Sequence, residues 1–122
     1  MITEGASDLQ FSISGSKSES NRALILQAFA SDRIVIENLS DSDDTRALIQ
    51  ALELAHESAS SEIKIDCGHA GSTFRFLAAY FAGLAGKEII LTGSEQLQQR
   101  PMAPLISALQ ALGANITYLA QE

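Results

Sequence analysis

The segment SGSKSESNRALILQ, Ser14 to Gln27, joins a short polar stretch to an apolar helix. Ser16 fits the N-cap position of that helix, and Glu19 three residues later completes a capping box. The same segment carries Lys17 and Arg22 close to the box. Capping alone does not explain two cations near the amino end of a helix, where the helix dipole already disfavours positive charge. Two interpretations therefore stand side by side, a simple helix start and a binding site for an anion.

Outward from this segment, helical and strand patterns alternate along the chain. The sequence predicts helices over 18–30, 41–55, 71–85 and 100–113. It predicts strands over 9–14, 33–39, 62–66, 87–93 and 115–119, with a polar loop at 56–61. In the last helix, Pro101 suits the first turn and Gly113 suits the cap. Helices that alternate with strands in this way predict an α/β fold.

The order of elements repeats within the chain. Segments that start at Arg22 and Arg75 both read arginine, apolar helix, β-branched strand, polar loop, arginine, apolar helix. The second arginines of the two segments are Arg46 and Arg100, so the two copies have nearly equal spacing. We therefore expect a single partial domain over 1–122, built from two repeat units at about 15–66 and 67–119.

Composition narrows the classes of function. The chain has 122 residues and a formal net charge of −7, which disfavours nucleic acid and anionic membranes as partners. A single cysteine, Cys67, excludes an internal disulfide and fits a reducing compartment. The first residues lack the features of a secretory signal, and the longest apolar run, at 74–86, is too short to span a bilayer. We expect a soluble, cytoplasmic protein.

The positive charges are not spread evenly over the chain. Five of the eight lysines and arginines lie at or just before predicted helix starts: Lys17, Arg22, Arg46, Arg75 and Arg100. Helix amino ends offer free N–H groups and a partial positive charge, so cations gathered there indicate binding of small, multiply anionic molecules. Arg46 follows Asp41, Asp43 and Asp44 closely, so we expect it to pair with these first-turn acids rather than with a ligand.

The segment DCGHAGSTFR, Asp66 to Arg75, could form a second anion seat. Gly68, Gly71 and Ser72 would let backbone N–H groups approach a ligand at the helix start, although an ordinary strand-to-helix turn explains the segment equally well. His69 could be a turn residue, a base or a hydrogen-bond donor, and with no second histidine nearby we expect no metal. We expect Cys67 to be a small buried apolar side chain rather than a nucleophile.

Four segments together resemble a known family. GSKSESNRALIL, SDSDDTRALIQAL, GHAGSTFRFLAAY and LTGSEQLQQRPMAPLISALQALGANI occur in order between about Ser14 and Tyr118. They resemble the N-terminal part of the 5-enolpyruvylshikimate-3-phosphate synthase (3-phosphoshikimate 1-carboxyvinyltransferase) family. The resemblance implies transfer of the enolpyruvyl group of phosphoenolpyruvate to the 5-hydroxyl of shikimate 3-phosphate, with release of phosphate and no metal or organic cofactor. This step belongs to the shikimate pathway of aromatic amino acid biosynthesis.

The resemblance also implies a fold and a set of site residues. Family members have two lobes of βαβαββ units with helix amino ends directed at the cleft, and this chain would form part of the first lobe. Lys17 would reach both substrates and is a possible proton donor, while Ser18 and Arg22 would bind shikimate 3-phosphate. The residues implied for phosphoenolpyruvate are Lys17, His69, Gly71, Arg75 and Arg100. Glyphosate occupies that second site in the family.

The chain departs from the family pattern in three places. Ser14 stands where the family often has proline, and the motif from His69 to Ser72 stands where it commonly reads NAGT. A β-hairpin of the family is reduced here to HESASS, at 56–61. Family members are also several times longer. We therefore expect a fragment that is inactive alone and that self-associates through faces left uncovered.

Other functions fit parts of the sequence. A UDP-N-acetylglucosamine enolpyruvyl transferase shares the layout, but Lys17–Ser18 with Asn21–Arg22 favours shikimate phosphate. A non-catalytic anion-binding module would bind phosphorylated acids without turnover. A purely structural α/β domain would use its arginines in surface ion pairs only.

Overall fold

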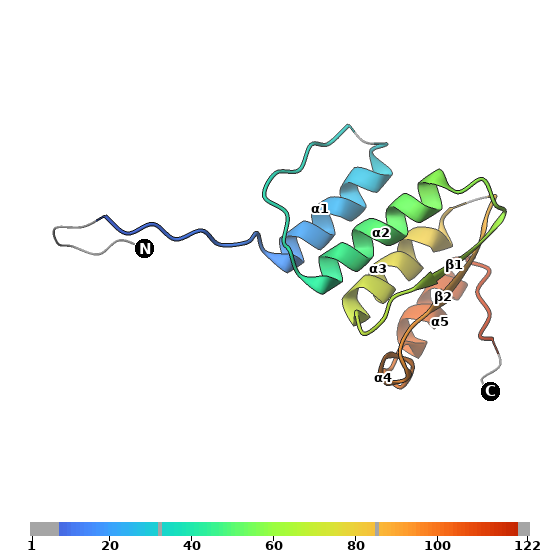
Figure 1. Ribbon diagram of the computed structural model, residues 1–122. Coiled ribbons are helices and arrows are strands. Elements are labelled where there is room, and N and C mark those ends of the chain that lie inside the picture. Colours follow the sequence, from blue (N-terminus) through green and yellow to red (C-terminus); the bar gives the residue numbers. More distant parts are fainter. Residues whose placement is uncertain (1–7, 32, 85, 120–122) are drawn as a thin grey trace.

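Helices and strands alternate through the middle of the chain in the computed structural model (Figure 1). The structure describes residues 8–31, 33–84 and 86–119. The elements in chain order are α1 (Lys17–Phe29), α2 (Asp43–Glu57), β1 (Glu62–Asp66), α3 (Gly71–Ala82), β2 (Glu88–Thr92), α4 (Glu95–Gln98) and α5 (Ala103–Ala111). The expected α/β class is confirmed.

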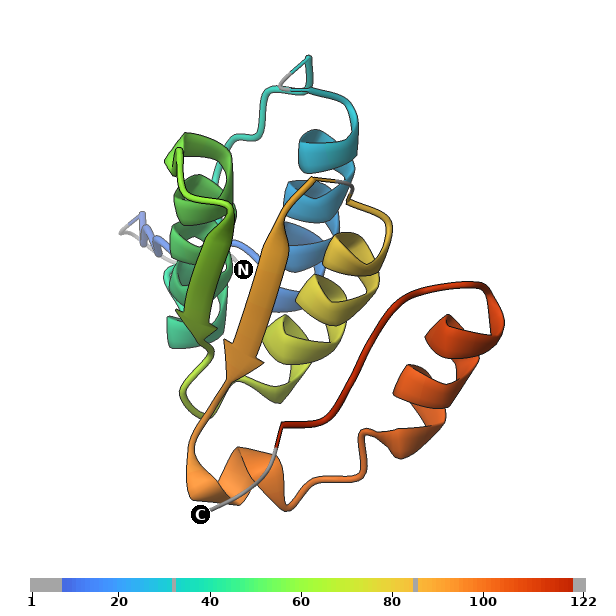
Figure 2. The same cartoon turned by 90° about the vertical axis from the view of Figure 1, so that its right-hand side faces the viewer.

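Two parallel strands form one layer, α2 and α3 pack on them as a second layer, and α1 lies behind α2 and α3 (Figure 2). The strands pair in register from Glu62 with Glu88 to Asp66 with Thr92. Helix α3 is the crossover that a parallel pair requires. It packs on β2, while α2 packs on β1 and α1 packs on both α2 and α3. Helix α5 contacts α3 and lies beside it, at the edge of the molecule (Figure 2).

The core lies between the sheet and the helices. β1 alternates exposed and buried residues, so Ile63 and Ile65 face inward. This period of two matches a strand with one covered face. Leu48 of α2 and Leu77 of α3 are fully buried in the same cluster. The hydrophobic burial that holds the two layers together is therefore centred on α2, α3 and β1.

Helix α1 is covered differently from the other two. Its buried residues are Ser20, Asn21 and Leu24, so two of the three are polar. Its large apolar side chains Leu26 and Phe29 are 61% and 64% exposed. The inner face of α1 is thus held by polar contacts as well as by apolar packing.

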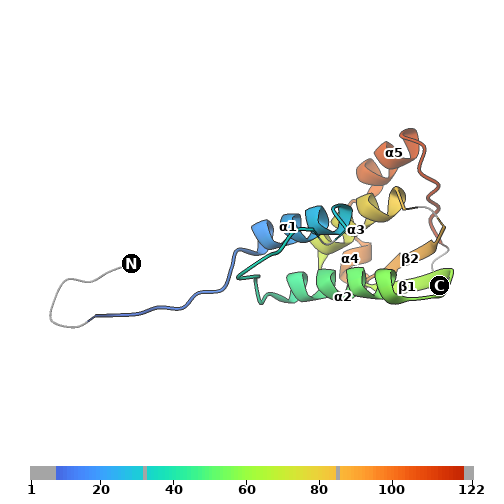
Figure 3. The same ribbon diagram turned by 90° about the horizontal axis from the view of Figure 1, so that it is seen from above.

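Three predicted strands are not formed, which corrects the sequence-based expectation. Residues 9–14, 33–39 and 115–119 run without helix or strand pairing in the described structure. A strand needs a neighbour to accept and donate its backbone hydrogen bonds, whereas a helix satisfies them within one segment. Residues 8–14 instead extend away from the helices (Figure 3). Their alternating apolar side chains Leu9, Phe11 and Ile13 are exposed.

The helix boundaries also refine the expectations. Pro101 lies outside α5, because Met102 is the N-cap and the proline of the first turn is Pro104. Gly113 ends α5 with φ of 102°, and its N–H donates to the Gln110 carbonyl oxygen as expected of a glycine cap. The short helix α4 was not predicted. None of the described helices has the length and hydropathy needed to cross a bilayer.

Candidate substrate-binding site

The amino ends of α1, α2 and α3 lie at one end of the molecule, which is also where β1 and β2 end (Figures 1 and 2). Parallel strands and crossover helices run in opposite directions, so strand carboxyl ends and helix amino ends share an edge. Helix amino ends carry unpaired N–H groups and partial positive charge. This end of the molecule is therefore where an anion is best accommodated.

A cavity of about 200 Å³ opens between α1 and α3 at this end. Its lining residues are Lys17, Ser18, Asn21, Arg22, Ser72 and Phe76. Lys17, Ser18 and Arg22 were predicted as one group from the sequence, and the structure brings them together. They share a cavity because positions i, i+1, i+4 and i+5 of a helix lie on one face.

The capping of α1 and the cations coexist. Ser16 is the N-cap, and its Oγ accepts a hydrogen bond from the Glu19 N–H at 3.3 Å. The cap satisfies the N–H group of Glu19, while Lys17 and Ser18 remain exposed. Arg22 donates from Nε to the Ser18 carbonyl oxygen at 3.2 Å, a bond that does not use the N–H groups of its two terminal nitrogens. The two interpretations of this segment are thus compatible.

Lys17 has a carboxylate partner on a different helix. Its Nζ lies 3.5 Å from Oδ2 of Asp44, with the two side chains 48% and 29% exposed. Asp43 instead pairs with Arg46 at 3.8 Å, which confirms the expected pairing of Arg46 with the first-turn acids. The sequence predicted Asp44 as a first-turn acid and a possible partner of Arg46, not as a partner of Lys17. Its pairing depends on the packing of α2 against α1, for which the sequence carries no local signal.

Two guanidinium groups meet at the start of α3. A Cβ placed on Gly71 would lie 2.5 Å from Nη1 of Arg100 and 3.4 Å from Nη1 of Arg75. Helix α3 begins at Gly71 and has no side-chain cap, whereas α1, α2 and α4 are each capped by a serine. Two cations beside an uncapped helix start form a strong site for a carboxylate or phosphate. Three residues predicted from the sequence therefore converge here.

His69 is held by the loop that follows β2. Its Nδ1 lies 2.8 Å from Oγ of Ser94, the N-cap of α4. The Ser94 N–H donates to the Gly68 carbonyl oxygen at 2.8 Å, and the Gly68 N–H donates to Oδ1 of Asp66 at 2.9 Å. These bonds join the loops after the two strands. Ser94 was not predicted as part of the site, and its partner His69 lies far from it in sequence.

Cys67 takes no part in an exposed site. It is 3% exposed, and burial raises the pKa of its thiol to about 11, with a further contribution from the charge of Asp66. The thiol is therefore neutral near pH 7 and is the buried apolar side chain that was expected. In the described part of the chain, no three or more His, Cys, Asp or Glu side chains are placed to hold a metal ion.

The cavity lining also contains Asn21, Ser72 and Phe76. The sequence predicted Asn21 as part of the pattern that favours shikimate phosphate and Ser72 as part of the second anion seat, whereas Phe76 had no predicted role. Asn21 shares the helix face of Lys17 and Arg22, so helical periodicity alone could have placed it there. Ser72 and Phe76 come from α3, and only the packing of α3 on α1 brings them to the cavity.

Comparison with known proteins matches nearly the whole chain, including both candidate binding regions, to one family. Residues 5–122 match the family model described as EPSP synthase (3-phosphoshikimate 1-carboxyvinyltransferase). The 3-phosphoshikimate 1-carboxyvinyltransferase of Bacteroides fragilis is 46% identical over 107 residues, covering 88% of this chain and 24% of that protein. The proteins of the same name from Escherichia coli and Aliivibrio salmonicida are 38% and 37% identical, each over 94% of this chain and over 31% and 32% of their own lengths. No solved structure matches the chain.

The chain spans about a quarter to a third of the length of these relatives. The alignments with the E. coli and A. salmonicida proteins, 135 and 136 residues long, exceed the 122 residues of the chain. These two relatives therefore carry additional residues within the matched region. The family match itself runs over nearly the whole sequence. The chain belongs to the EPSP synthase (3-phosphoshikimate 1-carboxyvinyltransferase) family.

Proposed function

We propose that the protein acts as a 3-phosphoshikimate 1-carboxyvinyltransferase and that this chain supplies one wall of the substrate site. In the reaction, the 5-hydroxyl oxygen of shikimate 3-phosphate bonds to carbon 2 of phosphoenolpyruvate. The bond from that carbon to the phosphate oxygen breaks, and in the net reaction the hydroxyl proton is taken up by the phosphate that leaves. The observation that carries the proposal is the meeting of Arg75 and Arg100 at the uncapped start of α3, beside the cavity that contains Lys17 and Arg22.

Shikimate 3-phosphate would occupy the cavity between α1 and α3. Lys17 offers an ammonium group, Ser18 a hydroxyl and Arg22 a guanidinium, and all three side chains line the cavity. Hydrogen bonds between ionised partners are stronger than those between neutral ones, which suits a ligand that carries a phosphate and a carboxylate. Lys17 is held near this cavity by Asp44, which limits the positions of its ammonium group.

Phosphoenolpyruvate would lie against the start of α3. The backbone N–H of Gly71 and the guanidinium groups of Arg75 and Arg100 provide donors for its carboxylate and phosphate. His69 would add a hydrogen-bond donor from the neighbouring loop, where its Nδ1 is hydrogen-bonded to Oγ of Ser94. Because α3 also lines the first cavity through Ser72 and Phe76, the two substrates would lie side by side.

Lys17 would serve both substrates and the chemistry. Its side chain lines the cavity, from which its ammonium group would donate a proton to the departing phosphate or to the methylene carbon. The names of the curated relatives favour this activity over a nucleotide-sugar enzyme or a non-catalytic module. Location in the cytoplasm is part of the proposal, supported by the free, buried Cys67. Competition of glyphosate with phosphoenolpyruvate is also part of the proposal, and it rests on the family resemblance.

The test is the release of phosphate by the complete translation product of the gene, supplied with both substrates. We expect Arg100→Ala to lower kcat/KM for phosphoenolpyruvate about a hundredfold or more, because a charged contact to the transferred group is lost. Arg33→Ala is the matched control, since Arg33 is exposed and follows the opposite end of α1. Equal rates for Arg100→Ala and the unaltered protein would contradict the proposal and favour a purely structural role for the arginine.

A further inference from the structure

Asn21 is the most buried residue that lines the α1–α3 cavity. It is 1% exposed, although it lies on a helix whose neighbouring positions Lys17, Ser18 and Arg22 are all exposed. A buried amide must find hydrogen-bond partners, because an unpaired polar group costs free energy when it is removed from water. The hydrogen bonds of Asn21 therefore show which polar atom of its amide is already paired and which is available to a ligand.

One side of the Asn21 amide is fixed by α2. The Thr45 hydroxyl donates to Oδ1 of Asn21 at 2.8 Å, and Thr45 is fully buried. The Ser42 hydroxyl donates to Oγ1 of Thr45 at 3.0 Å. The N-cap oxygen of Ser42 already accepts from the Thr45 N–H at 3.2 Å, so the Thr45 hydroxyl proton is left for Asn21. This chain of hydrogen bonds determines which amide atom of Asn21 is the acceptor.

The other side of the amide is the NH₂ group. Within the described part of the chain, no group accepts a hydrogen bond from Nδ2 of Asn21, and no fully buried side-chain nitrogen or oxygen lacks a partner. Nδ2 must therefore keep a small accessible surface. Asn21 lines the cavity with Lys17, Ser18 and Arg22, so that surface faces the place where the anion would bind.

We infer that Nδ2 of Asn21 donates a hydrogen bond to an oxygen of the phosphorylated acid held by Lys17, Ser18 and Arg22, and that Thr45 and Ser42 position it. This inference rests on the proposed function. A neutral, fixed donor adds geometric selection to a site whose other donors are long and flexible. Asn21 is a binding residue in this assignment, whereas Thr45 acts through it and is a positioning residue.

The same first turn of α2 is joined to both other helices. Thr73 of α3 donates from its hydroxyl to the Asp44 carbonyl oxygen at 2.8 Å, and the Asp44 carboxylate lies 3.5 Å from Nζ of Lys17. Residues 42–45 thus contact α1 through Asn21 and Lys17 and contact α3 through Thr73. The geometry of the cavity depends on this turn, although only Asn21 and Lys17 of these residues line it.

The first experiment measures binding of shikimate 3-phosphate to the complete translation product by calorimetry. Asn21→Asp keeps the acceptor for Thr45 but replaces the donor with an anionic oxygen, so we expect about a hundredfold weaker binding of shikimate 3-phosphate. Binding of phosphoenolpyruvate should change little, because its donors lie at the start of α3. Equal affinity of Asn21→Asp and the unaltered protein for shikimate 3-phosphate would overturn the inference.

Thr45 provides a second and independent pair of variants. Thr45→Val keeps the shape but removes the donor that orients the amide, and we expect about tenfold weaker binding of shikimate 3-phosphate. Thr45→Ser retains the hydroxyl and should restore the affinity relative to Thr45→Val. A Thr45→Val variant that folds and binds as tightly as the unaltered protein would remove the positioning role.

A measurement without mutation covers the case in which these variants fail to fold. We expect the side-chain amide protons of Asn21 to shift in the NMR spectrum on addition of shikimate 3-phosphate. Parallel additions of shikimate and of inorganic phosphate show whether the carboxylate or the phosphate is the acceptor. Shifts at Ser18 and Arg22 without a shift at the Asn21 amide would overturn the inference. No binding at all by the unaltered protein would instead mean that the proposed function is wrong.

Discussion

Arg75 and Arg100 lie 25 positions apart in the sequence, yet Nη1 of each lies within 3.4 Å of the position that a Cβ on Gly71 would occupy. Glycine at this position leaves the room that the Arg100 guanidinium occupies. Its backbone needs no special conformation, because Gly71 is an ordinary first residue of α3. The absence of a side chain therefore serves the approach of the two arginines rather than a turn.

A methyl group added at position 71 should weaken ligand binding while leaving the stability of the fold almost unchanged. In Gly71→Ala the new Cβ would lie 2.5 Å from Nη1 of Arg100, so the flexible end of that side chain must move. We expect about tenfold weaker binding of phosphoenolpyruvate by calorimetry, with an unfolding free energy within about 0.5 kcal/mol of the unaltered protein. Gly83→Ala is the control, since its nearest contact would be the Tyr80 carbonyl oxygen at 3.9 Å. Unchanged phosphoenolpyruvate affinity would refute this account of Gly71.

The raised pKa of the Cys67 thiol predicts that the protein becomes less stable in alkaline solution. Its thiol pKa is raised from the ordinary 9.0 to about 11 in the folded protein, first by burial and then by Asp66. Between these values the unfolded chain loses this proton and the folded protein keeps it, so stability falls as the pH rises from 9 to 11. We expect a loss of about 2 kcal/mol from this group across the window. Urea unfolding at several pH values should show a smaller decline for Cys67→Ala than for the unaltered protein.

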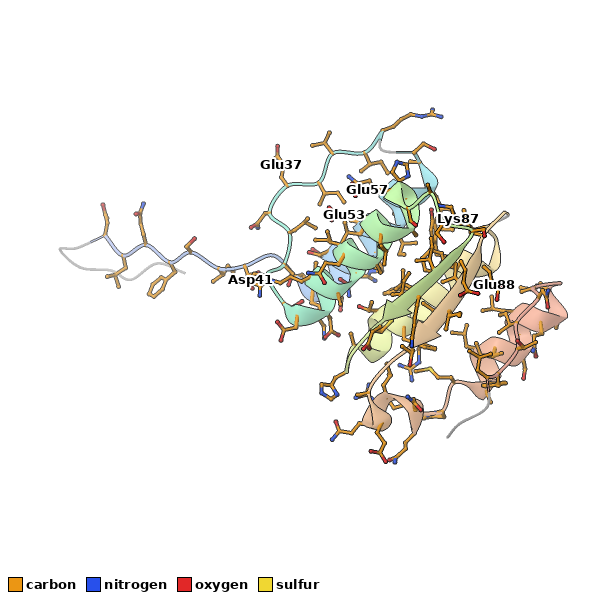
Figure 4. The ribbon with its side chains drawn as sticks, turned by 45° about the vertical axis from the view of Figure 1, so that its right-hand side comes forward. Glu37, Asp41, Glu53, Glu57, Lys87 and Glu88 are labelled. Carbon is orange, nitrogen blue, oxygen red and sulfur yellow. The ribbon has the colours of Figure 1, made fainter. Side chains whose placement is uncertain are left out.

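At the scale of the elements, hydrogen bonds and an ion pair connect the amino ends of α1, α2 and α3. A separate pair of hydrogen bonds connects the opposite end of α2 to the residue before β2. Lys87, just before β2, donates from Nζ to the carbonyl oxygens of Ala55 and Ser58 at 2.5 and 3.0 Å. Figure 4 shows Lys87 at this far end, next to the end of α2 that carries Glu57. These are carbonyl groups that a helix end leaves without internal partners. Lys87 thus ties the last turn of α2 to the sheet.

Removing this tie should destabilise the fold without touching the substrate site. We expect Lys87→Met to lower the unfolding free energy by about 1–2 kcal/mol, because two carbonyl groups lose a charged donor. Lys64→Met is the control, since Lys64 lies on the exposed face of β1. Denaturant unfolding measures the difference, and equal stabilities of the two variants would show that the Lys87 contacts are not needed.

At the scale of the whole molecule, many large apolar side chains of the described residues remain exposed. The largest exposures are those of Phe11, Ile13, Phe29, Val35, Leu112, Tyr118 and Leu119. In the described structure, the segments over 8–14 and 33–39 belong to no helix or strand and carry exposed apolar side chains, which makes them available for strand pairing. The chain spans about a quarter to a third of the length of its relatives.

These exposed faces predict self-association of the 122-residue chain. We expect its mass by light scattering to rise with protein concentration, because burial of apolar surface favours association. Ile13→Lys, at an 82% exposed position, should weaken this dependence. A monomer at every concentration would count against the prediction.

Helices α1, α2, α3 and α5 and the position of the charges follow from the sequence by itself. The serine at 16 caps α1 as its neighbouring residues predict, and the alternation of Glu62–Asp66 gives β1. These features are local, because a helix closes its hydrogen bonds within a few residues and a cap acts within one turn.

Tertiary structure decided what depends on contacts between distant segments. The segments at 33–39 and 115–119 have strand composition, but in the part of the chain that the structure describes they pair with no strand. The pairing of Lys17 with Asp44, the approach of Arg100 to Gly71 and the burial of Asn21 beneath Thr45 each join different elements. The sequence placed cations at the helix starts, and packing determined which of them share a site, because only packing sets the distance between side chains on separate helices.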